Sequence, residues 1–309
     1  MMITSLVGYT GFVGSNLSAS HDFDALYNSK NIHEAFGTNP DILIYSGLRA
    51  EKFLANKFPE KDLASVKEAF SNIQKINPKT VVLISTVDVY QSPLNVTEDS
   101  LIKTDNLPAY GLHRHLLEQW VEDEFENRLI LRLPALFGMN LKKNFLYDYI
   151  HKIPSLLDES KFTDLCAIDS SLKLFYTKEE NGFYKCRSLS ENERNILKRY
   201  FSKVGFSALN FTDSRAVFQF YNLANLWNHI TIALENGIQR LNLATEPIST
   251  STLYHYLCGE EFTNEMIKPV PNYDFKTKYA DIFGGDNGYL LSADTVMREI
   301  KEFVERSEL

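Results

Sequence analysis

The chain contains little cysteine, no excess of positive charge and no long apolar run. Its three cysteines, Cys166, Cys186 and Cys258, are far apart and odd in number, which argues against a disulfide framework or a cysteine metal site. We therefore expect a reducing compartment, the cytoplasm. No apolar segment approaches the roughly 20 residues of a membrane span. The strand-like run at the start of the chain leaves no room for a signal peptide.

The charge balance is acidic, with a formal net charge of -8 and charged residues spread along the chain without long blocks of one sign. Such a chain offers no basic surface to a nucleic acid, so we exclude nucleic acid as a partner. The 309 residues are 44% hydrophobic, which is enough to form a large core. We expect either one large α/β unit or two closely joined domains.

Short apolar runs alternate with helix-like segments through the first half of the chain. The runs with the pattern of buried strands are residues 3–7, 24–27, 41–45, 80–85 and 128–133. The helical segments between them are residues 12–20, 60–75 and 111–126. This alternation is typical of βαβ units, and it predicts an α/β fold with a doubly wound parallel sheet.

A glycine-rich turn follows the first of these strands. Gly8, Gly11 and Gly14 are spaced three apart, between the apolar run and an amphipathic segment. Glycine at the first two positions lets the backbone turn tightly and approach a pyrophosphate, and the third lets the helix pack closely. We predict that this turn, with Phe12 and Val13 at the start of the helix, binds a dinucleotide in a Rossmann domain. The alternative is an ordinary glycine-rich loop.

Two further strand ends are predicted to line the same cofactor. Ser46 and Gly47 follow the third strand-like run. The end of the second strand distinguishes NAD from NADP, because a carboxylate there binds the ribose 2′-hydroxyl of NAD. This position holds Asn28, Ser29 and Lys30, which include a cation and no carboxylate. The sequence therefore predicts a slight preference for NADP over NAD.

A second motif follows the strand at residues 80–85. Residues 85–90 read Ser-Thr-Val-Asp-Val-Tyr, and residues 110–114 read Tyr-Gly-Leu-His-Arg at the start of a helix. Side chains that follow parallel strands in such a sheet are well placed to bind ligands. Together with the glycine turn, these segments resemble the extended short-chain dehydrogenase/reductases, the branch that includes sugar-nucleotide epimerases, dehydratases and reductases.

The resemblance implies a catalytic unit of Thr86, Tyr110 and Arg114. Thr86 would hydrogen-bond the reacting oxygen, and Tyr110 would exchange its proton while a hydride moves to or from the nicotinamide. The family has a lysine where this chain has Arg114, whose guanidinium keeps the charge but not the geometry of an ammonium group. Two alternatives remain open: an ordinary helix-start tyrosine beside a solvated arginine, and a degraded active site in a protein that still binds nucleotide.

The resemblance also implies residues that bind the substrate. The segment that begins at Arg215 aligns with a family segment whose arginine pairs with the diphosphate of a sugar nucleotide, a role that suits a guanidinium. Ala135 replaces the substrate-binding asparagine of many epimerases, and with Asn144 it makes the chain more similar to reductases of 4-keto sugar nucleotides. Asp88 is a further substrate-side candidate. Because Val87 precedes it, the acidic pair that dehydratases need is incomplete.

The expected function is therefore that of an NAD(P)-dependent oxidoreductase acting on a sugar nucleotide, either a 4-keto sugar reductase or an epimerase. The alternative is a non-catalytic NAD(P)-binding sensor or scaffold protein of the same fold. A homodimer is left open. His113 and His115 are two residues apart on a predicted helix and point to different faces, so we interpret them as a surface pair and predict no metal site.

We predict two parts in the chain. Residues 1–145 and 214–247 would form the dinucleotide-binding Rossmann domain, and residues 146–213 and 248–309 a smaller, discontinuous substrate-side lobe. The region 146–213 is polar and helix-compatible, and it shows no clear strand pattern before residues 216–221. It matches no family that we can name.

Overall fold

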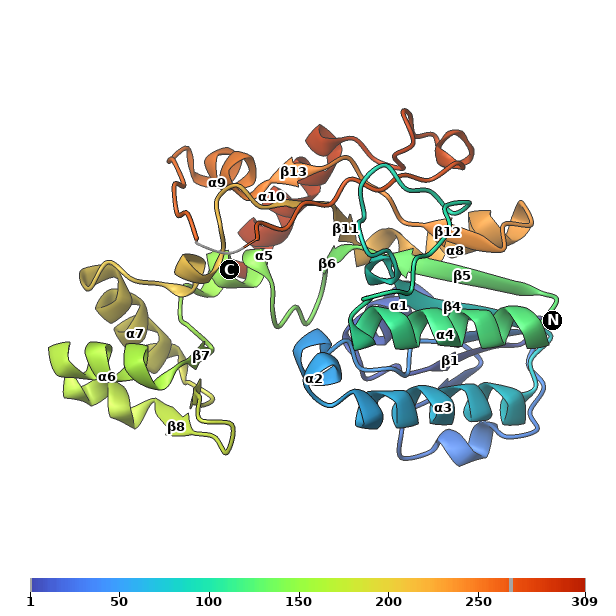
Figure 1. The fold of residues 1–309 in the computed structure, drawn as a ribbon, viewed down its shortest axis with the longest axis horizontal. Coiled ribbons are helices and arrows are strands. Elements are labelled where there is room, and N and C mark those ends of the chain that lie inside the picture. The colour runs from blue at the N-terminus through green and yellow to red at the C-terminus, as the bar shows by residue number, and fades with distance from the viewer. Residues whose placement is uncertain (1, 267–268, 309) are drawn as a thin grey trace.

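A computed structural model describes residues 2–266 and 269–308 (Figure 1). The helices are α1 Phe12–Ser20, α2 Lys52–Lys57, α3 Pro59–Ile76, α4 Ala109–Glu124, α5 Phe145–His151, α6 Glu159–Ile168, α7 Glu191–Lys203, α8 Leu226–Glu235, α9 Thr250–Cys258 and α10 Ala293–Glu308. The strands are β1 Thr4–Val7, β2 Ala25–Tyr27, β3 Ile42–Tyr45, β4 Thr80–Thr86, β5 Arg128–Leu133, β6 Ala135–Phe137, β7 Leu156–Leu157, β8 Tyr176–Lys178, β9 Tyr184–Cys186, β10 Val217–Phe218, β11 Phe220–Asn222, β12 Arg240–Asn242 and β13 Ile248–Ser249.

The largest sheet has six strands in the order β12-β5-β4-β3-β1-β2, and every neighbouring pair is parallel. Successive strands run outward from β1 in both directions, since β2 pairs with one edge of β1 and β3 with the other. This confirms the predicted doubly wound parallel sheet. The reversal of strand order beside β1 is the topological switch point, where α/β sheets bind ligands at the carboxyl ends of their strands.

The two faces of this sheet are covered by different helices, because successive side chains of a strand point to opposite faces. Leu6 and Ile44 pack with α1 and α8 on one face, whereas Val7 and Leu43 pack with α3 and α4 on the other. In Figure 1, α3 and α4 lie in front of the sheet. Both faces are buried, which explains why the strands read as continuous apolar runs rather than alternating ones.

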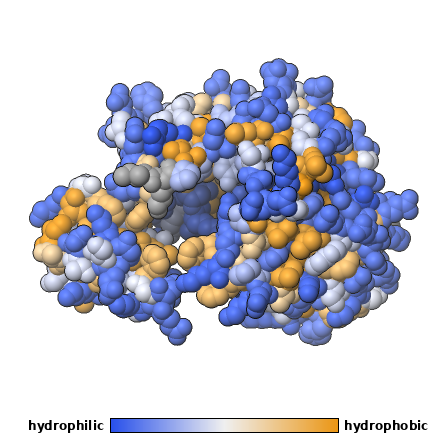
Figure 2. All heavy atoms as spheres, viewed as in Figure 1, coloured by the Kyte–Doolittle hydropathy of each residue, from blue (hydrophilic) through white to orange (hydrophobic). Residues whose placement is uncertain are grey.

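Within the region 146–213, residues 153–206 form a core of their own (lower left in Figure 1). The sequence of this region shows no clear strand pattern, yet β7, β9 and β8 form a three-stranded antiparallel sheet. These strands are two or three residues long, which is too short for an alternating pattern to appear in the sequence. In the space-filling view, the surface is hollowed between this part and the larger body of the molecule (Figure 2).

Helix α10, in the C-terminal segment of residues 269–308, packs against a separate two-stranded sheet formed by β6 and β11. Helix α10 contributes Val296 and Ile300 to a core shared with Phe145 of α5 and Phe220 of β11. This core also includes Leu146, Tyr149 and Leu209, so the range 146–213 contributes to two cores, and the division into two domains stays a prediction. Among the helices of the described residues, none combines the length and the apolar character that a membrane span requires.

Candidate active site

The glycine turn follows β1 at the switch point. Gly8 has a φ of +93°, and a Cβ on it would lie 2.5 Å from the Ser46 carbonyl oxygen. A Cβ on Gly14 would lie 2.1 Å from the Gly8 carbonyl oxygen, so α1 packs directly on the turn. Gly11 begins the helix with an ordinary φ of -79° and no side-chain cap. The N–H groups of a helix start without a cap are free to bind an anion, which fits a pyrophosphate.

The other predicted cofactor residues surround this turn. The Ser46 hydroxyl donates a hydrogen bond to the Val7 carbonyl at 2.8 Å, which holds the end of β3 against the end of β1. Asn28 directly follows β2, and its side-chain oxygen accepts a hydrogen bond from the Lys30 backbone at 2.9 Å. The strand register therefore places residues 28–30 after the second strand, as expected. Their contact with a cofactor stays a prediction.

Thr86, Asp88 and Tyr110 gather at the carboxyl end of β4. Thr86 ends the strand, and its hydroxyl accepts a hydrogen bond from the Asp88 backbone at 3.2 Å. Helix α4 approaches this turn at Gly111, where a Cβ would lie 2.1 Å from the Asp88 carbonyl oxygen. That close approach holds Tyr110, in the first turn of α4, beside Asp88. Tyr110 is buried, with 7% of its surface exposed.

The surroundings of Tyr110 act on its pKa in opposite directions. Burial is the largest influence and raises the pKa, because the phenolate loses hydration, and the Asp88 carboxylate raises it further. Arg114, a hydrogen bond with Thr86, and Lys52 lower it. The net result is a pKa above the ordinary value for tyrosine. Tyr110 therefore stays protonated at neutral pH and can serve as a proton donor.

Arg114 is not a solvated arginine. Its guanidinium donates two hydrogen bonds to Asp62 of α3, both at 3.2 Å, and a third to the Arg49 carbonyl at 3.0 Å. Its Cζ lies 4.7 Å from the centroid of the Tyr110 ring. The prediction of a surface histidine pair is also wrong: His113 is buried against the same Asp62 at 2.8 Å, and the side chain of His115 is 13% exposed. Residues from α3 thus fix the start of α4.

The structure adds three residues that the sequence did not indicate. The Lys52 ammonium donates to a carboxylate oxygen of Asp88 at 2.8 Å, and the Tyr273 hydroxyl donates to the same oxygen at 3.0 Å. The side chain of Asn56 accepts a hydrogen bond from the Tyr110 backbone at 2.9 Å. No motif marks these residues, because their contacts depend on how α2 and the C-terminal segment pack against the sheet.

Arg215 lies apart from Tyr110, before β10. It donates to both carboxylate oxygens of Asp213, at 2.9 and 2.8 Å, and lies 3.1 Å from Glu265. Hydrogen bonds from Arg215 and from the Met266 backbone hold the pKa of Asp213 well below its usual range. The Arg215 side chain is 48% exposed, so part of the guanidinium reaches solvent.

Asn144 has a structural task that the sequence did not reveal. It caps α5, where its side-chain oxygen accepts hydrogen bonds from the Leu146 and Tyr147 backbones. Its amide nitrogen donates to the Leu136 carbonyl at 2.8 Å. These bonds hold the side chain at the start of α5, and its contact with a substrate stays a prediction.

A strand contact links the Arg215 segment with the Tyr110 cluster. Val217 of β10 exchanges backbone hydrogen bonds with the segment 271–273. Tyr273 of that segment stacks on Phe218, with ring centroids 5.9 Å apart, and reaches Asp88 with its hydroxyl. The two sets of predicted site residues, about a hundred positions apart in sequence, are therefore joined through Tyr273.

A buried ionic network supports β4 and β5 beneath this site. Arg132 donates to Glu118 of α4, with a shortest distance of 2.6 Å, and to the Tyr90 hydroxyl at 2.7 Å. Ser85 donates to the same Glu118 at 2.5 Å. Burial alone would raise the pKa of Glu118, but these donors and His115 hold it below the usual range. The network fixes the strand that ends in Thr86 against α4.

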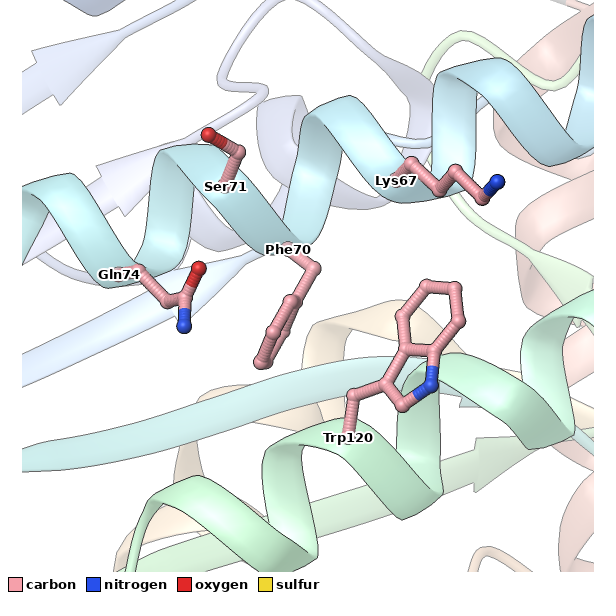
Figure 3. Close-up of a pocket in the computed structure, with 5 residues that line it drawn as sticks. All are labelled: Lys67, Phe70, Ser71, Gln74 and Trp120. Carbon is pink, nitrogen blue, oxygen red and sulfur yellow. The ribbon is translucent and has the colours of Figure 1, made fainter.

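A shallow cavity of about 260 Å³ lies elsewhere, between α3 and α4 (Figure 3). Phe70 and Trp120 line it with their rings, whose centroids are 5.6 Å apart. Trp120 is ten residues beyond Tyr110 on α4, roughly 15 Å along the axis at 1.5 Å per residue. This cavity is therefore not part of the candidate active site.

No model of a known family and no curated protein sequence matches the chain. Its structure is similar to a UDP-glucose 4-epimerase of Thermotoga maritima with UDP-glucose (12% identity, 98% of each chain covered, TM-score 0.63). It is also similar to a dTDP-4-dehydrorhamnose reductase of Bacillus anthracis with NADP (14% identity, 99% of each chain, TM-score 0.62). A third similar structure is the Bordetella bronchiseptica enzyme WbmG with NAD and UDP (12% identity, 99% of this chain and 94% of that one, TM-score 0.65).

These likenesses extend over nearly the whole chain, including residues 146–213, for which the sequence offered no match. At such low identity they show the arrangement of the backbone rather than the chemistry. The chain has the fold of the extended short-chain dehydrogenase/reductases, as its glycine turn and its two downstream motifs predict.

Proposed function

We propose that this protein is an NAD(P)-dependent oxidoreductase that acts on a sugar nucleotide, as a 4-keto sugar reductase or an epimerase. The observation that carries the proposal is the gathering of Thr86, Asp88 and Tyr110 at the end of β4, in the same sheet edge as the glycine turn. Solved structures of the same fold are described in complex with NADP, with NAD and UDP, and with UDP-glucose, which supports the proposal.

The glycine turn fits a dinucleotide because two of its positions exclude any side chain. Gly8, Gly11 and Gly14, with the backbones of Phe12 and Val13, would hold the pyrophosphate at the start of α1. The end of β3, at Ser46 and Gly47, would contact the cofactor next to this turn. When bound, a nicotinamide dinucleotide supplies or accepts the hydride. The acidic residue that would repel a 2′-phosphate is missing from positions 28–30, which supports NADP.

Tyr110 and Thr86 perform the proton chemistry in this proposal. Thr86 would donate a hydrogen bond to the carbonyl oxygen of a keto sugar and so orient it. Tyr110, which is protonated at neutral pH, would donate its proton to that oxygen as the alcohol forms. In the reverse direction the Tyr110 phenolate would accept the proton. Arg215 would pair with the diphosphate of the substrate, where its half-exposed guanidinium faces solvent.

Hydride exchange on a panel of nucleoside diphosphate sugars and their 4-keto forms tests the proposal. We expect turnover with at least one member, followed by the absorbance of the reduced nicotinamide. Gly11→Val is the control, because the position has an ordinary φ and a Cβ there meets only the Gly8 carbonyl oxygen, at 3.2 Å. This variant should fold and lose cofactor binding. Cofactor binding without turnover on any member would instead support a non-catalytic nucleotide-binding protein.

We further propose a cytoplasmic location, on the strength of the three unpaired cysteines. A homodimer is consistent with this function and stays a prediction. The face of α3 and α4 that carries Phe70 and Trp120 is the apolar surface at which we would look first. Sedimentation of the purified protein, compared with a Trp120→Glu variant, decides whether that face joins two copies.

A further inference from the structure

Arg114 stands where the family that this chain resembles has a lysine, and its guanidinium already pairs with the carboxylate of Asp62. Both hydrogen bonds to Asp62 and the third to the Arg49 carbonyl hold the guanidinium in place. The Arg114 and Asp62 side chains are only 5% and 11% exposed. Breaking such a buried pair leaves an uncompensated charge, so Arg114 does not leave Asp62 to serve another group.

A second cation reaches the same tyrosine from helix α2. Lys52 and Asn56 are four residues apart and therefore lie on one face of this helix. Asn56 binds the Tyr110 backbone at 2.9 Å, which directs that face toward the start of α4. The Lys52 ammonium then lies 2.8 Å from Asp88. Figure 1 shows α2 on the side of the larger body that faces residues 146–213.

Lys52 and Asp88 differ from the buried pair in their access to solvent. The Lys52 side chain is 49% exposed and that of Asp88 is 22% exposed, so this pair stands at the surface of the site. We propose that Lys52 is a positioning residue for the proposed reaction: it balances the charge of Asp88 beside Tyr110, a task that Arg114 cannot perform while it is bound to Asp62. This inference rests on the proposed function only for its effect on turnover.

The charged and titratable groups that face Tyr110 come from four elements. They are Arg114 from its own helix, Asp88 from the turn after β4, Lys52 from α2, and Tyr273 from the C-terminal segment. The Asp88 carboxylate raises the pKa of Tyr110, whereas Arg114 and Lys52 lower it. Without Lys52 the carboxylate keeps only the Tyr273 hydroxyl as a side-chain partner among these groups. Tyr110 then becomes a weaker acid.

The test compares three lysine variants of the full chain. Lys52→Met removes the charge at Asp88, and Lys52→Arg restores a cation. Lys57→Met is the matched control, because Lys57 lies on the same helix over the rings of Phe53 and Phe58. The titration of Tyr110 is followed by NMR of Cζ-labelled tyrosine, with the resonance assigned from Tyr110→Phe. The kcat and KM of reduction are measured in parallel.

We expect Lys52→Met to move the Tyr110 titration to higher pH and to lower kcat at neutral pH a few-fold, since a weaker acid donates more slowly and Lys52 is the smallest of the influences on the Tyr110 pKa. KM should change little. Lys52→Arg should return both values toward wild type, and Lys57→Met should leave them unchanged. An unshifted Tyr110 titration in a folded Lys52→Met variant overturns the inference, and so does an equal shift in Lys57→Met.

A second variant keeps the test decisive if Lys52→Met does not fold. Asp88→Asn removes the carboxylate that Lys52 balances, so the Tyr110 titration should move to lower pH; no movement, or movement upward, contradicts the inference. The titration requires no substrate, which separates the two proposals. If the titrations shift as expected but no sugar nucleotide is converted, the proposed function fails while the charge balance stands.

Discussion

Arg114 and Arg215 each hold an aspartate with two hydrogen bonds, yet they differ in burial. The Arg114 and Asp62 side chains are 5% and 11% exposed, whereas Arg215 is 48% exposed over a buried Asp213. In the first pair both charges are removed from water. In the second, the arginine also contacts Glu265, whose side chain is 65% exposed. A bound anion can displace an exposed carboxylate of this kind from the arginine.

The difference shows that the charge of an arginine does not by itself make it a ligand-binding residue. A buried pair resists exchange, because removal of one partner leaves the other charged and poorly hydrated. A half-exposed guanidinium loses little when a diphosphate replaces one of its carboxylates. We therefore interpret Arg114 as a support for the position of Tyr110 and Arg215 as the residue available to a substrate. If this interpretation is right, substitutions at the two arginines and at the residues near them should have distinct effects.

The largest effect is expected at Tyr110, which Arg114 supports. Tyr110→Phe removes the proton donor, and the proton transfer of a positioned side chain is worth about 10²- to 10⁴-fold in rate. Turnover should fall by this factor while calorimetric cofactor affinity stays close to wild type. Full turnover by Tyr110→Phe, on a substrate that the wild type converts, would show that the family mechanism does not operate here.

The two arginines should differ in their contribution to stability. Arg114→Met leaves the Asp62 carboxylate buried with His113 as its remaining side-chain partner, and we expect the free energy of unfolding to fall by about 3 kcal/mol. Arg215→Met should cost clearly less, since Asp213 keeps hydrogen bonds from the Arg215 and Met266 backbones. Urea denaturation of both variants measures the difference. Equal losses would remove the distinction between a supporting and an available arginine.

For substrate binding, in contrast to stability, we expect the larger effect at Arg215 rather than at Arg114. Arg215→Ala removes the guanidinium that would pair with the diphosphate, so KM for the sugar nucleotide should rise roughly tenfold to a hundredfold. Cofactor affinity should not change, because the glycine turn is a separate part of the site. The measurement is KM for substrate beside a calorimetric titration with cofactor. An unchanged KM assigns the diphosphate to other residues.

The smallest effect concerns the cofactor, away from both ion pairs. Asn28, Ser29 and Lys30 follow β2 without a carboxylate, and we expect NADPH to bind more tightly than NADH. A tenfold preference corresponds to about 1.4 kcal/mol. Paired titrations with the two reduced cofactors test this. A tenfold preference for NADH would contradict it and leave Lys30 without a role at the ribose.

The glycine turn shows how far the sequence alone reaches. Spacing and position predicted that Gly14 allows close packing and that Gly8 permits a tight turn, and the structure shows both. Local motifs likewise predicted Thr86 after a strand and Tyr110 at the start of a helix, and the structure has Thr86 at the end of β4 and Tyr110 in the first turn of α4. The strands of residues 146–213 were missed because two or three residues carry no periodicity. The burial of His113 was missed because its partner Asp62 lies 51 residues away.

Local sequence patterns specify the alternation of strands and helices in the first half of the chain, the turn after the first strand and the residues at the strand ends. These features depend on apolar periodicity and on glycine, which act over a few neighbouring residues. Which charged side chains pair with one another depends on how distant elements pack in three dimensions. Arg114 and its partner Asp62 are separated by 52 residues in sequence, and Lys52 and Asp88 by 36 residues. Tyr273 and Asp88 are separated by 185 residues. Such pairs form because helices and segments pack on a common sheet, and no local pattern records that packing.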